Sequence, residues 1–281
     1  MSKYLFNDQT RLWKRLTPAL LMYLVTANIL ADVDNSRYVM GVFPHLPITD
    51  LERVYSPMAA DLASGLNKEV FFQSKATFED FKMELDAETY DIVVVQPFDY
   101  IYIADNHNYV PLARRGEPLE GVFVTAQDSN IKTPKDLAGK RIALPPKGAA
   151  VSRLAIDLLL ENGIATGNVK LSFHRSHINC MQQLLIKQAD VCVTAEPMLR
   201  FFNHKRKTNL QFVFKTKSIP HVLFAAHKRV PETYRQQAMN IITTWDDIEE
   251  KKQLLTNGKF PPFVPATDSE YDAVRQLLKD K

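Results

Sequence analysis

Side chains suited to ligand contact gather directly after predicted strands in this chain. In open sheets of parallel strands, ligands bind beyond the carboxyl ends of the strands, close to helix N-termini. Applied to the segments that follow the predicted strands, this rule gives a set of candidate ligand-binding residues: Pro44, His45, Gln96, Phe98, Tyr100, Gly148, Ala149, Ala150, His177, Thr194 and Glu196.

One of these segments, Lys147-Gly148-Ala149-Ala150, opens a predicted helix with small residues. Small side chains leave the backbone N–H groups of a helix N-terminus accessible, and such groups attract an anion or another hydrogen-bond acceptor. The P-loop pattern GxxxxGK followed by Ser or Thr is missing, so this turn does not predict a nucleotide site. The simpler interpretation, that Gly and Ala only start a helix, stays open.

Histidine and aromatic side chains add two further kinds of contact. His177 stands at a predicted helix start, where its ring can donate to or accept from a ligand and can respond to pH. A helix cap or a surface histidine is the alternative. Phe98 and Tyr100 follow a buried strand and either line a cleft or pack into the core. These residues predict a site of mixed polar and aromatic character.

Patterns for catalysis and metal binding are missing from the sequence. There is no GxSxG, CxxC or HExxH, and the serines and histidines show no triad spacing. We therefore expect a binding protein and not an enzyme, without a metal or a cofactor. The two cysteines, Cys180 and Cys192, fall on a predicted helix and the next predicted strand. A disulfide and two separate buried thiols both stay open.

The N-terminus has the layout of a secretory signal sequence. A basic start precedes an uncharged run over residues 16–31, with small residues at Ala27 and Ala31. This run is shorter than a transmembrane helix needs, which is about 20 apolar residues. We expect residues 1–31 to be a signal peptide, cleaved after Ala27 or Ala31 on export to the periplasm. An uncleaved membrane anchor is the alternative.

Charge argues against one class of partner. The chain has 35 Lys plus Arg and 32 Asp plus Glu, and residues 1–31 hold four of the former and one of the latter, which leaves 31 of each in residues 32–281. A neutral mature chain exerts no general attraction on nucleic acid. We expect a monomer with a small-molecule ligand and no nucleic-acid partner.

Strand and helix signals alternate from Arg37 onward. Continuous apolar runs such as Ile92–Val95 are typical of strands buried on both faces. Alternating strands and helices predict an α/β fold of mostly parallel sheets flanked by helices.

The alternation falls into two sets, which predict two lobes. We expect residues 32–126 plus 210–281 to form the first lobe and residues 127–209 the second. Closure of the lobes about a hinge near residues 124–128 and 210–214 is the expected motion.

Several short segments, in this order and spacing, resemble the phosphonate-binding protein family, the periplasmic components of phosphate, phosphite and phosphonate ABC importers. The resemblance implies a two-lobed type II periplasmic binding fold that holds one ligand between its lobes and delivers it to an ABC permease. The segments that carry it are 41–44, 90–93, 96–100, 128–131, 136–143, 160–164, 176–177, 188–191, 218–220 and 229–231.

The resemblance also points to a changed ligand turn. The family holds its oxyanion with a turn rich in Ser, Thr and Gly. The corresponding turn here is Lys147-Gly-Ala-Ala-Val-Ser152. Its one hydroxyl belongs to Ser152, which is therefore a further candidate ligand-binding residue. The family tyrosine before the crossover is replaced near Leu119, and the family histidine corresponds to His177. We therefore expect weak or no binding of simple alkylphosphonates, and a ligand that is another oxyanion or a more apolar molecule.

Two alternatives to a transport protein stay open at this point. A sensory protein would dock on a kinase ectodomain instead of a permease. An enzyme on the same bilobed fold, of the menaquinone- or thiamine-pathway type, would work in the cytoplasm, which the predicted signal peptide argues against.

Overall fold

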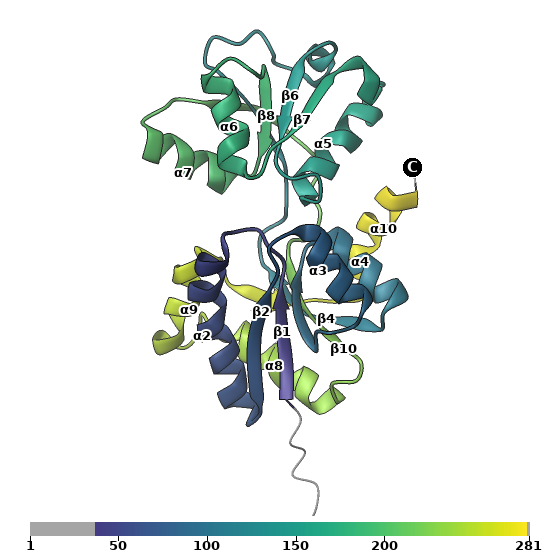
Figure 1. The fold of residues 1–281 in the computed structure, drawn as a ribbon, viewed down its shortest axis with the longest axis vertical. Helices are drawn as coiled ribbons and strands as arrows, with labels where there is room; N and C mark the ends of the chain where they lie inside the picture. Colours follow the sequence, from purple (N-terminus) through teal and green to yellow (C-terminus); the bar gives the residue numbers. More distant parts are fainter. Residues whose placement is uncertain (1–36, 280–281) are drawn as a thin grey trace, which may run out of the picture. The chain divides into compact units, whose positions relative to one another are not determined.

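The structure is a computed structural model that describes residues 37–279. The predicted signal peptide and its cleavage sites lie outside the described residues. Two β-sheets flanked by helices make up the described chain, which confirms the α/β prediction (Figure 1). No described helix is both long and apolar enough to cross a membrane.

The larger sheet has six strands, and the three that come first in the sequence run parallel to one another. β10 and β11 are antiparallel to their neighbours. Across the sheet the order is β11 (Phe263–Pro265), β4 (Tyr109–Arg115), β10 (Leu223–His227), β3 (Ile92–Val95), β1 (Arg37–Val42) and β2 (Glu69–Ser74). Its helices are α2 (Ile48–Leu66), α3 (Phe78–Asp86), α4 (Pro97–Asn106), α8 (Glu232–Thr243), α9 (Lys252–Gly258) and α10 (Asp272–Lys279).

The smaller sheet has five strands, of which β5 alone is antiparallel to both of its neighbours. The order is β7 (Lys170–Phe173), β6 (Arg141–Leu144), β8 (Val191–Thr194), β5 (Val122–Thr125) and β9 (Gln211–Lys215). Its helices are α5 (Ala150–Glu161), α6 (His177–Leu185) and α7 (Glu196–Arg206). Short 3-10 helices cover Pro134–Leu137, Thr166–Asn168, Glu249–Lys251 and Asp268–Tyr271.

The central strands form because their side chains are apolar on both faces. All four residues of β3 are buried, as are all four of β5 and of β8. Helices cover both faces of such strands, so continuous burial replaces the alternation of a half-exposed strand. These strands end where the candidate ligand residues begin, at Gln96 after β3 and at Thr194 in β8.

Two crossover segments connect the sheets: residues 116–121 between β4 and β5, and residues 216–222 between β9 and β10. They pair with each other, since Leu119 N donates to Ile219 O at 2.8 Å and Ile219 N donates to Leu119 O at 3.1 Å. Gly121 N also donates to Thr216 Oγ1 at 2.9 Å. The connection is therefore a hydrogen-bonded double strand.

The two sheets divide the chain at slightly different residues from those predicted for the lobes. The prediction placed residues 122–125 and 211–215 in the first lobe, whereas β5 and β9 belong to the smaller sheet. The segments 124–128 and 210–214 named as hinge lie largely in these strands, and the crossovers precede β5 and follow β9. An apolar run such as Val122–Thr125 predicts a buried strand but not the sheet that it joins. The division into lobes itself stays a prediction.

A disulfide joins Cys180 of α6 to Cys192 of β8, with 5.8 Å between the two Cα atoms. Both residues are fully buried. Of the two alternatives that the sequence left open, the structure therefore has the disulfide.

Candidate ligand-binding site

The candidate residues at the ends of β3 and β6 lie together. Gln96, the N-cap residue of α4, is buried. Its Oε1 accepts a hydrogen bond from Ala150 N at 2.8 Å, and its Nε2 donates to Gly148 O at 3.0 Å. The side-chain amide of Gln96 thus satisfies the first N–H of α5, one of the donors that a helix leaves free. In this conformation that N–H belongs to Gln96 and is not free for an anion.

A second pair forms at the ends of β7 and β8. His177, the first residue of α6, places Nδ1 2.8 Å from the Oγ1 of the fully buried Thr194. Burial lowers the pKa of His177 to about 4, so the ring is neutral at neutral pH. When the threonine hydroxyl donates to Nδ1, the ring carries its proton on Nε2 and offers it as a donor.

His45, which follows β1, is also neutral at neutral pH. Its Nδ1 lies 3.0 Å from Phe43 O, an atom that only accepts, so this nitrogen carries the proton. The ring stacks on Phe43 with 4.4 Å between centroids. Burial and, to a smaller extent, the charge of Arg115 lower the pKa of His45 to about 3.

Arg115 is a candidate ligand-binding residue that the sequence prediction missed. It is the last residue of β4, and its guanidinium lies 4.2 Å from the ring centroid of Phe260. Its Nε is buried without a hydrogen-bond partner among the described residues. It also bonds the hydroxyl of Tyr55, whose pKa burial nevertheless raises to about 12. A buried guanidinium N–H without an acceptor is a donor available to a ligand oxygen.

Two further groups on the crossovers face the same region. His221 Nδ1 accepts from Val222 N at 2.7 Å, so its proton lies on Nε2, which is 3.8 Å from Glu117 Oε1. Burial, Arg115 and His45 lower the pKa of His221. The other carboxylate oxygen of Glu117 is buried without a hydrogen-bond partner among residues 37–279. Glu117 follows β4, so the rule that found His45 and Gln96 could also have found it, whereas His221 precedes β10 and lies outside that rule.

The remaining candidates have structural partners. Tyr100 donates to Asp268 Oδ1 at 2.5 Å and packs on Tyr271, and Phe98 is buried in the core of the larger sheet. Buried Ser152 donates to Pro145 O at 3.3 Å. Glu196 forms ion pairs with Arg200 and Lys215. Pro44 is half-buried beside His45.

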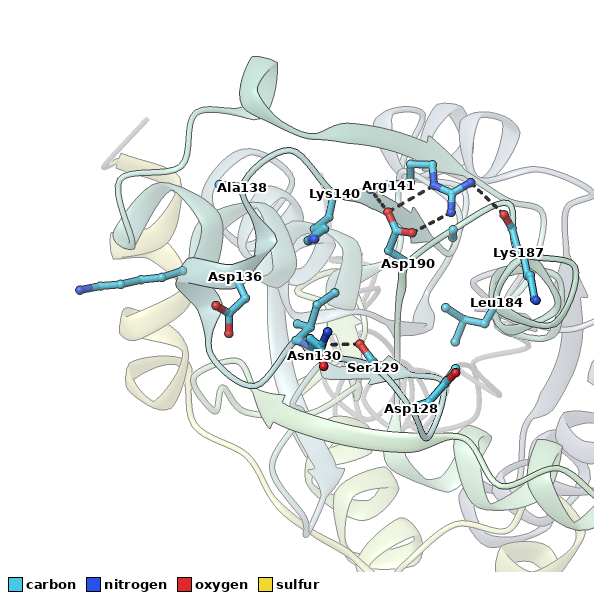
Figure 2. Close-up of a pocket in the computed structure, with 14 residues that line it drawn as sticks. Asp128, Ser129, Asn130, Asp136, Ala138, Lys140, Arg141, Leu184, Lys187 and Asp190 are labelled. Atoms are coloured by element: carbon cyan, nitrogen blue, oxygen red, sulfur yellow. Dashed lines mark hydrogen bonds and ion pairs between the residues drawn. The ribbon is translucent and has the colours of Figure 1, made fainter.

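A cavity of about 610 Å³ in the smaller-sheet region contains none of the candidates. Arg141 begins β6 there, directly after Lys140, and Asp190 precedes β8, so the cavity lies at the amino ends of these parallel strands. Figure 2 shows Asp190 and Arg141 paired at one side of it, with 2.7 Å between Asp190 Oδ1 and the guanidinium, which also bonds Lys187 O. Arg141 and Asp190 thus have structural partners at this edge. Nor do the described residues bring together three side chains able to hold a metal.

Comparison with known proteins places this geometry in a family. The chain is similar to PhnD1 from Prochlorococcus marinus in complex with methylphosphonate, at 17% identity and a TM-score of 0.76, over 86% of this chain and 97% of that one. It is also similar to a binding protein component of an ABC phosphonate transporter from Pseudomonas aeruginosa, at 14% identity and a TM-score of 0.72, over 87% and 86% of the two chains.

A third similar structure is the periplasmic aliphatic sulphonate binding protein SsuA from Escherichia coli, at 14% identity and a TM-score of 0.64, over 87% of this chain and 91% of that one. These likenesses confirm the predicted type II periplasmic binding fold. The family of periplasmic substrate-binding proteins of phosphonate ABC transporters matches residues 40–271. Since this match spans most of the sequence, the chain belongs to that family and is a periplasmic solute-binding protein of an ABC transporter.

Proposed function

We propose that this protein binds a small oxyanion with Arg115, His221 and His177. The observation that carries the proposal is the buried Nε of Arg115, which has no acceptor among the described residues. Hydrogen bonds from a guanidinium to an oxyanion are among the strongest in proteins. A ligand oxygen supplies the acceptor that this nitrogen lacks.

Two of the histidines, His177 and His221, support an anion because they are neutral donors beside one cation. Burial lowers the pKa of His45, His177 and His221, so Arg115 supplies the positive charge of the site at neutral pH. The Nε2–H groups of His177 and His221 add neutral donors.

The site draws on both sheets, which supports a closing motion. Arg115 ends β4 and His221 lies on a crossover, whereas His177 opens α6 beside the smaller sheet. We infer that the two sheets are the two lobes and that the paired crossovers 116–121 and 216–222 are the hinge. The loaded, monomeric protein delivers its ligand to an ABC permease, the partner of its family, or to the ectodomain of a sensor kinase. Residues 1–31 are its export signal, cleaved after Ala27 or Ala31.

Isothermal calorimetry with a panel of oxyanions tests this proposal. The panel comprises phosphate, phosphite, methylphosphonate, sulfate and methanesulfonate, and the variant is Arg115→Gln. Arg114→Gln is a matched control because it makes the same charge change one residue away, where the guanidinium already bonds Glu270 Oε1 at 2.8 and 3.0 Å.

We expect the wild type to bind one of these oxyanions, with methylphosphonate weak because the turn 147–152 has lost the family's hydroxyls. A hydrogen bond to a charged group contributes about 1.5–3 kcal/mol, so Arg115→Gln should weaken binding roughly 10- to 150-fold. Arg114→Gln should leave the affinity within about threefold of wild type. Equal losses in both variants, or no binding of any oxyanion, would contradict the proposal.

A further inference from the structure

Two parallel links connect helix α6 to strand β8, which lie side by side (Figure 1). One is the contact of His177 Nδ1 with Thr194 Oγ1 at 2.8 Å. The other is the disulfide between Cys180 and Cys192. Each link joins one residue of the helix to one residue of the strand.

The spacing of the four residues places both links between one face of helix α6 and one face of the smaller sheet. His177 and Cys180 are three residues apart in the helix, which puts them on one face about one turn apart. Cys192 and Thr194 are two residues apart in the strand, so their side chains share one face of the sheet. The covalent link therefore lies one helical turn from the polar one.

This arrangement makes the polar link sensitive to the position of the helix. The rise of an α-helix is about 1.5 Å per residue, so a slip of α6 by two residues along its axis moves the His177 ring by about 3 Å and carries it beyond hydrogen-bond distance of Thr194. The side-chain bond at the start of α6 does not resist such a slip, because Ser176 Oγ accepts from Asn179 N within the same segment. The disulfide does resist it, because it fixes Cys180 to the strand.

We propose that the Cys180–Cys192 disulfide is a positioning element of the binding site, which holds the imidazole of His177 against Thr194 and so aims its Nε2–H at the ligand. The part of this inference that concerns the ligand rests on the proposed function. The part that concerns the ring does not, because it is measurable without any ligand.

The test records the ring nitrogens of His177 by long-range proton–nitrogen NMR in the folded protein without ligand. His177→Ala identifies the signal among those of the seven histidines. The disulfide is removed by C180A/C192A and, without any substitution, by chemical reduction of the wild type. Leu184→Ala is the matched control, because Leu184 is a buried residue of the same helix and the same core cluster, and its loss leaves the disulfide intact.

We expect one ring tautomer in the wild type and in Leu184→Ala, and averaged nitrogen shifts in both disulfide-free forms. The titration midpoint of the ring should also rise by about one pH unit or more there, as water reaches the ring. If both disulfide-free forms melt at a lower temperature but keep the wild-type tautomer and titration, the disulfide has no positioning role and the proposal is wrong.

A separate measurement tests whether the His177 ring contacts the ligand. Calorimetry with phosphate and methylphosphonate compares His177→Ala, C180A/C192A and the wild type. A similar loss in both variants, at least about fivefold, supports the positioning of a ligand donor. If His177→Ala binds as the wild type does while the disulfide-free forms show averaged nitrogen shifts, the disulfide positions the ring but the ring does not contact the ligand, and the proposed function is wrong on that point.

Discussion

Replacing His177 with glutamine should make the stability of this protein less dependent on pH. Burial lowers the pKa of His177 to about 4, whereas a histidine in an unfolded chain has a pKa of about 6.5. Between these two values the unfolded chain binds a proton that the folded chain does not bind. Stability therefore rises with pH across this window and falls as the pH is lowered through it. Glutamine keeps a hydrogen-bonding side chain but does not titrate.

The size of the effect follows from the width of the window. One pH unit between the two pKa values corresponds to about 1.4 kcal/mol of unfolding free energy. Lowering the pH from about 6.5 to about 5 should therefore cost the wild type roughly 2 kcal/mol through His177 alone. Other groups, including His45 with its pKa of about 3, contribute to the total loss in both proteins. The comparison of variant with wild type removes their contribution.

Urea unfolding at about pH 7.5 and about pH 5 gives the unfolding free energies needed. The difference between the two pH values should be smaller in His177→Gln than in the wild type by roughly 2 kcal/mol. His204→Gln is the control, because His204 is exposed on α7, and its difference should match that of the wild type. An unchanged pH dependence in His177→Gln would refute the reasoning, since it would mean that the ring is not buried as a neutral group.

Three further outcomes are expected. The mature periplasmic protein should begin at Asn28 or Asp32 by N-terminal sequencing, and a protein that keeps its first residues contradicts cleavage. Small-angle scattering should give a smaller radius of gyration at saturation with the bound oxyanion, and an unchanged radius contradicts lobe closure. Gly41→Ala should lower the melting temperature by several degrees, because its Cβ would lie 2.4 Å from the Tyr90 ring. Gly167→Ala should leave the melting temperature unchanged, because a Cβ there meets nothing within 4 Å. Equal melting temperatures of the two variants would contradict the packing argument.

The sequence was sufficient to predict the helices and strands because the apolar pattern that leads to burial lies within each segment. The run Ile92–Val95 is apolar throughout, and all four residues are buried in β3. An apolar run does not indicate which strands it pairs with, because Val122–Thr125 would be equally buried in either sheet. Its partners β8 and β9 begin at residues 191 and 211, far along the chain. Assignment of β5 and β9 to the smaller sheet therefore needed the fold.

The candidate site was predictable in part for a related reason. The strand-end rule finds residues that follow a strand in sequence, and it named His45, Gln96, His177 and Thr194. Arg115 satisfies the same rule at the end of β4, but a charged residue at a strand end is equally typical of a solvated surface, and only the fold shows its Nε to be buried. Tyr55 lies inside α2, where no local pattern marks a contact with Arg115.

The position of Arg115 at the end of β4 and of His221 on a crossover gives a physical reason for the proposed ligand-dependent closure. A ligand that touched the larger sheet alone would bind open and closed forms equally and would shift neither. His177 and Thr194 belong to the smaller sheet and its helix, so an oxyanion that reaches His177 gains that contact only when the two sheets are close. Because Gln96 already joins the sheets through Gly148 and Ala150, the ligand adds to an existing interaction and needs to supply only part of the free energy of closure.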